Sequence, residues 1–244
     1  MNYMNDHNSR WDLFNRIVQP KVIKVCIYVS NLLFLGGLFV GALIAVFFGP
    51  EGYNMIDNYI SDLGSFRYTP TPFILDSIAM ITAVFLVPIF FYSYKNLISG
   101  KKEIIFDSTK PLSKRIFNLY VAINIFIGLI CLIIATIGLF GVGLFSEDRT
   151  TELGLHYFFS IVVFAGLATG ALFNGIAILL KKTLYPRILG AYMMIGPLTA
   201  ALLFVFPPPS TTLPFLEWMM LFAAFLWLIP LSIIILKKFK TKAE

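Results

Sequence analysis

Cysteine, histidine and charged residues are all scarce in this chain of 244 residues. It contains two cysteines and two histidines, and only 13% of its residues are charged. Soluble globular domains average about 25% charged residues, so the composition excludes that class. Cys26 and Cys131 both fall inside apolar stretches, where an isolated cysteine usually packs as a small hydrophobic side chain. The cysteines therefore indicate neither a disulfide framework nor a metal site.

Apolar residues make up 58% of the sequence, and most of them lie in six long stretches. The stretches cover residues 22–48, 71–93, 117–143, 155–180, 188–206 and 217–236. Each is close to the ~20 residues that cross ~30 Å of hydrocarbon as a helix. Helix is required because backbone polar groups must be satisfied internally, and the strands of a membrane β-barrel would alternate in polarity. The predicted fold class is all-α, a polytopic membrane protein with six transmembrane helices.

Basic residues are segregated between the segments that connect these stretches. Of the 19 lysines and arginines, all but Arg67 and Arg149 lie in the two tails or in the second and fourth connections. This pattern predicts a multi-pass protein of the cell membrane with both termini in the cytoplasm. The predicted organisation is a tail over 1–21, a membrane domain over 22–236 and a basic tail over 237–244. Topology accounts for the net charge of +6, so no nucleic-acid partner is expected.

Acidic residues show the opposite distribution. Eight of the thirteen lie in the outer connections or at the helix ends beside them: Glu51, Asp57, Asp62, Asp76, Glu147, Asp148, Glu152 and Glu217. Ionisable groups close to hydrocarbon are costly, so they are functional candidates by default. The acids, together with His156, predict a polar pocket on the extracytoplasmic side.

The strongest candidate for chemistry in this set is His156. If the fourth span begins near Thr151, then Glu152, His156 and Ser160 fall at i, i+4 and i+8 on one helix face. A carboxylate one turn away orients an imidazole, which predicts His156 as a general base held by Glu152. Metal ligation with other carboxylates and a purely structural interhelical hydrogen bond are the alternatives. The chain lacks an HExxH motif and has one outer histidine, so no metal is assigned.

Residues 58–65 precede the second span as Asn-Tyr-Ile-Ser-Asp-Leu-Gly-Ser, in which apolar and polar residues alternate. The segment is therefore expected to lie against the bundle, with Ser61 and Asp62 directed inward. Gly64 permits a turn with positive φ.

Two further acids open predicted helices, Asp76 in the second span and Glu217 in the sixth. Either could line the pocket, or could simply complement the positive end of its helix dipole. Trp218 after Glu217 is expected to anchor the helix at the membrane interface.

These motifs resemble domain-of-unknown-function family 998, archaeal and bacterial proteins with six predicted spans. The resemblance rests on 58–64, on Gly-Val-Gly-Leu-Phe-Ser-Glu-Asp at 141–148 followed by His156, and on Glu217 before the last span. The chain is more distantly similar to the damage-regulated autophagy modulators, which also carry an Ile-Ser-Asp-x-Gly run and a histidine at these places. Members of that wider group are linked to autophagy, lipid-anchor remodelling and lipid distribution, so the resemblance implies a role with membrane lipid.

Three functions are compatible with these observations. The first is binding or modification of a lipid headgroup, with catalytic and substrate-binding candidates His156, Glu152, Asp62, Ser61, Asp76, Glu217 and Ser160. The second is a structural or regulatory membrane protein whose acids only cap helices. The third is an ion-coupled transporter in which Pro197 and Pro230 break their helices. No GxSxG, P-loop or dinucleotide motif is present, and the sequence specifies neither a cofactor nor an oligomeric state.

Overall fold

Six long helices form the protein, as the computed structural model of residues 14–99, 105 and 108–241 shows. They are α2 (Pro20–Phe48), α3 (Phe73–Ile98), α5 (Leu112–Leu144), α6 (Leu155–Leu180), α7 (Arg187–Val205) and α8 (Leu213–Thr241). Two 3-10 turns, η1 (Ser61–Gly64) and η2 (Glu147–Arg149), lie in the connections. All six helices are long and apolar enough to cross a membrane, and the described residues include no strand. The predicted all-α class and its six spans are confirmed.

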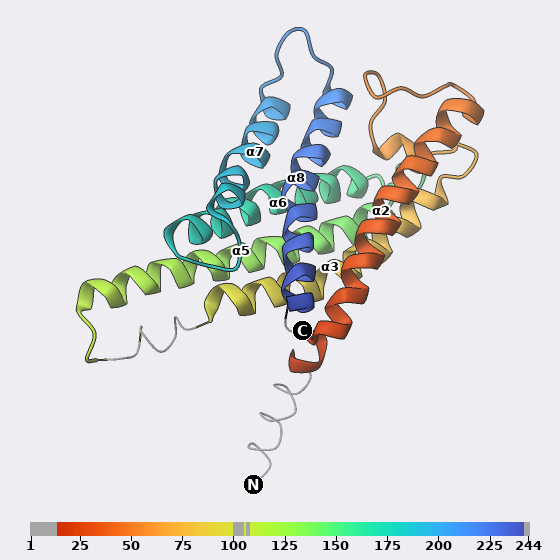
Figure 1. Ribbon diagram of the computed structural model, residues 1–244. Helices are drawn as coiled ribbons and strands as arrows, with labels where there is room; N and C mark the ends of the chain where they lie inside the picture. The colour runs from red at the N-terminus through yellow and green to blue at the C-terminus, as the bar shows by residue number, and fades with distance from the viewer. Residues whose placement is uncertain (1–13, 100–104, 106–107, 242–244) are drawn as a thin grey trace.

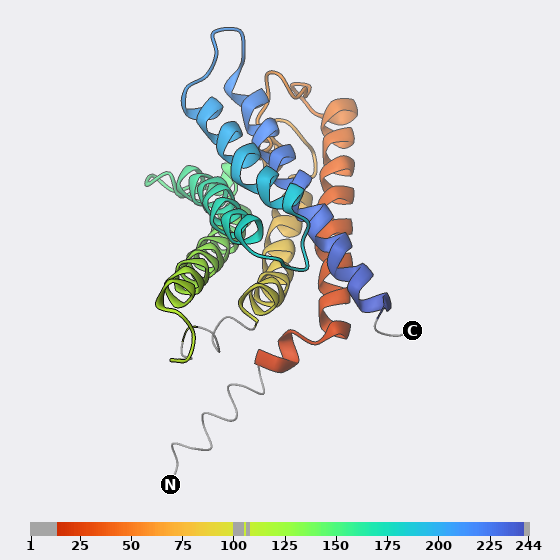
Figure 2. The same cartoon turned by 60° about the vertical axis from the view of Figure 1, so that its left-hand side comes forward.

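The bundle has two distinct ends (Figure 1). The start of α2 and the end of α8 lie at one end, with the end of α3, the start of α5 and the α6–α7 connection. The α2–α3, α5–α6 and α7–α8 connections lie at the other end, as the turned view in Figure 2 also shows. We call these the basic end and the acidic end, after the residues that they carry. That the basic end faces the cytoplasm remains a prediction.

Glycines allow α5 and α6 to pack closely side by side. A Cβ atom on Gly166 of α6 would lie 2.8 Å from the Ala135 Cβ atom and equally close to the Cys131 carbonyl oxygen of α5. A Cβ atom on Gly170 would meet Leu132 in the same way. Small residues at such positions let membrane helices approach without a large apolar driving force. The pair forms one wall of the bundle.

The helix α8 packs against α7, but its backbone comes close to α2 and α6 at only a few positions. The fully buried Trp227 of α8 fills one part of the space between them, in a core that also contains Phe90 and Ile125. Both α7 and α8 continue through Pro197 and Pro230, so neither helix is broken as the transporter hypothesis requires. The longest helix, α5, has 33 residues, whereas α7 has 19.

The α2–α3 connection folds over the acidic end. Tyr53, Ile60 and Leu63 are buried there against Leu38 of α2 and Leu221 of α8. The segment therefore lies against the bundle, as the alternation predicted.

Gly64 does not adopt the positive φ that a glycine permits at this position. Among the described residues only Gly52 and Gly154 have positive φ, and Gly64 instead closes η1 in a right-handed turn. Its lack of a side chain serves packing, because a Cβ atom would lie 2.9 Å from a carboxylate oxygen of Asp76.

Candidate functional site

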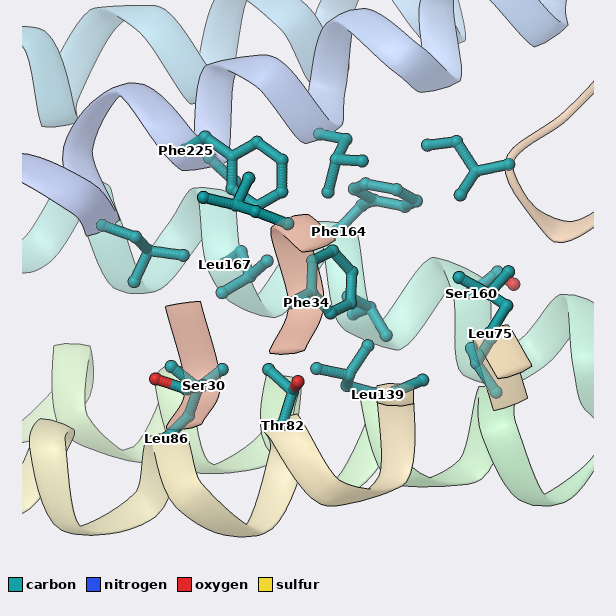
Figure 3. Close-up of a pocket in the computed structure, with 18 of the residues that line it drawn as sticks. Ser30, Phe34, Leu75, Thr82, Leu86, Leu139, Ser160, Phe164, Leu167 and Phe225 are labelled. Atoms are coloured by element: carbon teal, nitrogen blue, oxygen red, sulfur yellow. The ribbon is translucent and has the colours of Figure 1, made fainter. Parts of the chain in front are cut away.

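An interior cavity of about 110 Å³ lies between α2, α3, α5, α6 and α8. Its walls are almost entirely apolar, with Phe34, Leu139, Phe164 and Phe225 converging on it from four different helices (Figure 3). The cavity exists because α8 crosses α2 and α6 with few close backbone contacts, so side chains do not fill the space between them.

Three polar side chains form the end of the cavity nearest the acidic end of the bundle: Ser61, Ser160 and Glu217. Glu217 lies in the second turn of α8, is only 8% exposed, and accepts a hydrogen bond of 2.7 Å from the backbone N–H of Ile60. Ser160 lies one turn into α6 and donates to the His156 carbonyl oxygen over 2.9 Å. We call this group the polar mouth.

Three polar residues lie deeper in the cavity: Ser30 and Asn31 of α2, and Thr82 of α3. The Thr82 side chain of α3 is 4% exposed, and Figure 3 shows its hydroxyl group directed from α3 into the cavity. Its oxygen has no hydrogen-bond partner among the described residues. A buried hydroxyl without a partner is destabilising, so Thr82 differs from Ser30, whose hydroxyl donates to the Ile27 carbonyl oxygen.

Beside the polar mouth, the buried Asp62 carboxylate is held by its own segment. It accepts hydrogen bonds from the Asn58 amide at 3.3 Å and from the Tyr59 backbone N–H at 2.9 Å. These bonds explain the Asn-x-x-x-Asp spacing of the 58–65 segment, since both donors precede the carboxylate within one turn.

Glu147 of η2 lies next to Asp62. Its Oε2 atom is buried, and no donor among the described residues reaches it. Burial, then the adjacent charge of Asp62, raises the pKa of Glu147 from its ordinary value of 4.5 to about 7. Two neighbouring carboxylates cannot both be charged without a penalty, and this repulsion adds to the effect of burial on Glu147. Asp62 also lies within electrostatic range of His156 and Glu217.

Two aromatic side chains fix this segment to the bundle. The Tyr53 hydroxyl donates to the Tyr59 carbonyl oxygen over 2.8 Å, and burial raises the pKa of Tyr53 above its ordinary value. The Trp218 indole N–H donates to the Asn58 carbonyl oxygen over 3.3 Å. Trp218 is only 4% exposed, so the prediction of an interfacial anchor is wrong: the ring packs inside the protein, where its N–H has a partner.

His156 begins the first turn of α6, and its ring is held by the backbone. Nδ1 lies 2.8 Å from the Phe145 carbonyl oxygen, which can only accept, so Nδ1 carries the proton in the neutral ring. Nε2 is then a lone-pair acceptor, and it is buried without a partner among the described residues. That is the arrangement of a base with a free lone pair.

The predicted stack of Glu152 above His156 is wrong. Helix α6 begins at Leu155, and Gly154, with φ of 65°, turns the chain just before it. Glu152 therefore lies outside the helix and is exposed. The Phe145 carbonyl oxygen, and not the Glu152 carboxylate, orients the His156 ring. Only His156 and Ser160 share the predicted helix face.

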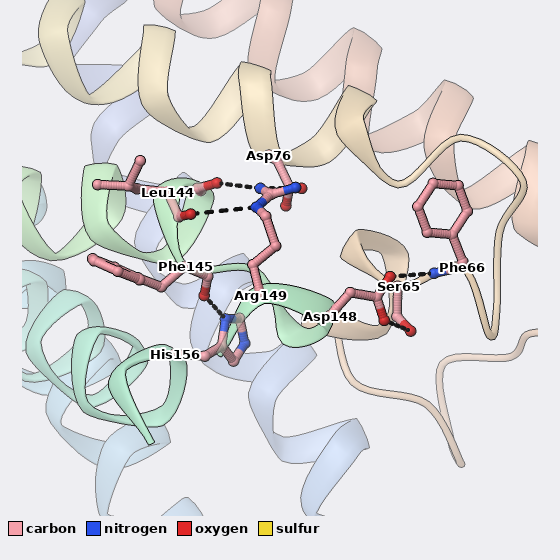
Figure 4. A network of polar contacts seen from close by, with 9 residues as sticks. Ser65, Phe66, Asp76, Leu144, Phe145, Asp148, Arg149 and His156 are labelled. Carbon is pink, nitrogen blue, oxygen red and sulfur yellow. Dashed lines mark hydrogen bonds and ion pairs between the residues drawn. The ribbon is translucent and has the colours of Figure 1, made fainter. Parts of the chain in front are cut away.

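Asp76 is in the first turn of α3, as predicted, but its carboxylate is engaged away from the cavity. Arg149 donates to it over 2.8 Å and also to the Gly143 carbonyl oxygen over 3.0 Å (Figure 4). In the same network the Asp148 carboxylate accepts from the Ser65 hydroxyl and the Phe66 N–H, each over 2.7 Å. The network ties the 58–65 segment, α3 and the α5–α6 connection into one rigid cap.

The structure thus brings five of the seven predicted site residues to one region: Ser61, Asp62, His156, Ser160 and Glu217. Asp76 and Glu152 lie elsewhere. No group of three or more His, Cys, Asp or Glu side chains in the described part of the chain could hold a metal ion. Sequence reasoning missed Arg149, although its being one of two basic residues at the acidic end was a usable signal. An apolar cavity with an acidic, hydroxylated mouth can bind an amphipathic molecule.

The comparisons with known proteins give one match. The family model described as Frag1/DRAM/Sfk1/Cwh43P N-terminal domain matches residues 23–237, a range that includes nearly all of the six helices. This confirms the predicted likeness to the damage-regulated autophagy modulator group. No curated protein and no solved structure matches the chain.

Proposed function

The chain belongs to the Frag1/DRAM/Sfk1/Cwh43P N-terminal domain family, and from this premise we propose that it binds a membrane lipid in its interior cavity. The acyl chain lies among the aromatic and aliphatic walls, and the headgroup lies at the polar mouth of Ser61, Ser160 and Glu217. In this proposal the mouth faces the extracytoplasmic side of the cell membrane. The observation that carries the proposal is that the cavity is apolar along its length and acidic at one end.

The size of the cavity supports a chain rather than a bulky ring system. An apolar protein cavity of ~150 Å³ stays dry and binds benzene, so one of about 110 Å³ takes a segment of an aliphatic chain. Side chains such as Phe34 and Phe225 offer such a segment the apolar contact that it has in the bilayer, and require no polar group of it.

The charges around the mouth favour a cationic, zwitterionic or hydroxylated headgroup. Asp62, Glu147 and Glu217 lie together there. The two arginines at this end are already paired, Arg149 with Asp76 and Arg67 with Glu51. An anionic headgroup would therefore meet carboxylates without a compensating cation, whereas an ammonium or hydroxyl group would find acceptors.

A second candidate function, modification of the lipid, is favoured by one observation. The Nε2 atom of His156 has a buried, unpartnered lone pair close to Asp62. In this version His156 is the general base that removes a proton from a headgroup hydroxyl, and Asp62 stabilises the imidazolium that forms. The likeness to domain-of-unknown-function family 998 belongs to the same proposal, because the residues that carry it are Asp62, His156 and Glu217.

The binding proposal is tested by the lipid that the purified protein retains. Lipid extracted after extensive detergent washing is identified and quantified by mass spectrometry. Ala224→Leu, which fills the cavity from α8, should reduce the retained lipid at least fivefold without lowering the unfolding temperature. Thr199→Leu, on the exposed face of α7, is the matched control and should retain lipid normally.

Two results would overturn the proposal. One is equal lipid retention by the Ala224→Leu and Thr199→Leu proteins, and the other is retention of bulk membrane lipid in its ordinary proportions by both. For the catalytic version, a His156→Ala protein that folds normally and leaves the cellular lipid profile equal to that of the unaltered protein would remove the base role. The structural or regulatory function remains only if the binding proposal fails as well.

A further inference from the structure

A second cavity lies at the basic end of the bundle, far along the helices from the polar mouth. It is an open cleft of about 490 Å³ between the start of α5 and the end of α6. Its lining consists of three lysines, two small polar residues and one aromatic residue: Lys110, Ser113, Lys114, Phe117, Asn118 and Lys181. No acid is among these described lining residues, so the lining itself is basic.

Lys181 is held in place in the cleft before any ligand arrives. Its ammonium group donates to the Asn118 amide oxygen and lies 5.2 Å from the centroid of the Phe117 ring. Asn118 is itself buried and donates from its amide nitrogen to the Lys114 carbonyl oxygen over 2.7 Å. The two contacts fix the position of a charge that would otherwise swing freely in solvent, which lowers the entropy lost when an anion binds.

The backbone at the start of α5 also favours the binding of an anion in the cleft. Pro111 precedes the helix, and its carbonyl oxygen accepts from the N–H groups of Lys114 and Arg115. The N–H groups of Leu112 and Ser113, in the first turn, have no intrahelical acceptor, as in any helix. They lie at the positive end of the helix dipole, on the wall that carries the Ser113 hydroxyl.

The cleft also adjoins an exposed apolar surface of α5. One turn beyond it, Ile116, Leu119 and Tyr120 of α5 are exposed apolar or amphipathic side chains that must face lipid. Phe117 belongs both to this exposed apolar surface and to the lining of the cleft. The lysines therefore border an exposed apolar surface that continues from the cleft along α5.

We propose that this cleft binds the phosphate of an anionic membrane lipid. The lysine ammonium groups and the first-turn N–H groups of α5 contact the phosphate, and the acyl chains lie along the exposed face of α5. Basic pockets between transmembrane helices bind such headgroups in general. The continuity of the cleft with a lipid-facing surface favours a lipid over a soluble phosphate. This site is separate from the cavity of the proposed function and opposite to it in charge preference.

The experiment uses the full-length protein, stripped of lipid in a neutral detergent. Dihexanoyl phosphatidic acid, dihexanoyl phosphatidylcholine and inorganic phosphate are titrated separately, and binding is measured by calorimetry and by the unfolding temperature. Saturable binding of the phosphatidic acid, with at least tenfold weaker binding of the other two, is expected. Equal binding of phosphatidylcholine would overturn the proposal, and equal binding of inorganic phosphate would overturn the lipid as occupant.

Variants locate the site. The double variant Lys114→Gln/Lys181→Gln should bind the phosphatidic acid at least about tenfold more weakly. Lys237→Gln/Lys240→Gln, exposed residues at the end of α8, makes the same change in net charge and should bind normally. Ser113→Glu provides a variant whose fold is not at risk, because an acid in the first turn of α5 favours the helix. It should also abolish binding. Equal weakening in the α8 control, or unchanged binding in Ser113→Glu, would refute the site.

Discussion

Arg149 donates a hydrogen bond of 2.8 Å to the carboxylate of Asp76, a residue 73 positions earlier in the chain. Asp76 is 5% exposed, so Arg149 is the cation that allows this carboxylate to be buried. The pair joins the first turn of α3 to the α5–α6 connection (Figure 4), and the Asp76 carboxylate lies next to Gly64 at the end of η1. It holds the cap together and leaves the polar mouth free of cations.

Replacing Arg149 with Gln should lower the free energy of unfolding by about 1–3 kcal/mol, because Asp76 would be buried without its partner. Arg67→Gln is the matched control, since its pair with Glu51 is exposed to solvent and should contribute little to stability. Thermal unfolding in detergent measures both. An equal loss in the two proteins would show that the burial of Asp76 does not matter.

Gly143→Ala should destabilise the same junction by about 1–3 kcal/mol. A Cβ atom at Gly143 would lie 2.4 Å from the Asp76 carbonyl oxygen, and backbone atoms there cannot move aside cheaply. Gly36→Ala in the middle of α2 meets nothing within 4 Å and should leave the unfolding temperature unchanged or raise it. Thermal unfolding of the two variants, each measured against the unaltered protein, checks this. Equal unfolding temperatures for the two variants would show that Gly143 does not pack closely against the Asp76 backbone.

The stability of the protein should fall as pH rises from about 4.5 to about 7 through the titration of Glu147. The folded protein keeps a proton on this group that the unfolded chain has lost, since burial and Asp62 raise its pKa to about 7. The stabilisation is complete below the unfolded value and is lost as the pH passes the folded one. Unfolding temperatures measured across this range should show a shallower slope for Glu147→Gln. Glu152→Gln, at an exposed position, should keep the slope of the unaltered protein, and loss of the slope in both would contradict the assignment.

Thr82→Val should stabilise the lipid-free protein by about 1 kcal/mol. It replaces a buried hydroxyl group that has no partner among the described residues with a methyl group of nearly the same shape. Thr136 is equally buried but donates to the Ile133 carbonyl oxygen over 2.7 Å, so Thr136→Val should have no such benefit. Chemical unfolding of the delipidated proteins compares them. A stability loss at Thr82 would mean that its hydroxyl has a partner in solution, such as bound water.

The spans were predictable because hydrocarbon leaves the backbone no alternative to helix. Apolar stretches such as 155–180 and 22–48 agree closely with α6 (Leu155–Leu180) and α2 (Pro20–Phe48). The segregation of lysine and arginine likewise placed the start of α2 and the end of α8 at one end of the bundle (Figure 1). These rules depend on composition and length alone, so a single sequence is enough to apply them.

The site was only partly predictable, because its details depend on one or two residues of backbone geometry. Gly154 delays the start of α6 by four residues from the assumed Thr151, and that removes Glu152 from the face of His156. The inward position of Trp218 follows from the fold of the 58–65 segment against α8, which no local pattern reports. The cavity itself results from the way in which α8 crosses α2 and α6, a tertiary relationship without a sequence signature.

The unequal helix lengths suit the protein to a membrane of restricted thickness. With 19 residues, α7 is about 28 Å long, slightly less than the ~30 Å of an average hydrocarbon core, whereas the 33 residues of α5 extend to about 50 Å. Figure 1 accordingly shows α5 inclined across the steeper α7. A long helix can tilt further when the bilayer thins, but a helix as short as α7 cannot lengthen when it thickens. Hydrophobic mismatch at α7 would therefore disfavour thick, sterol-rich membranes and sort the protein toward thinner ones.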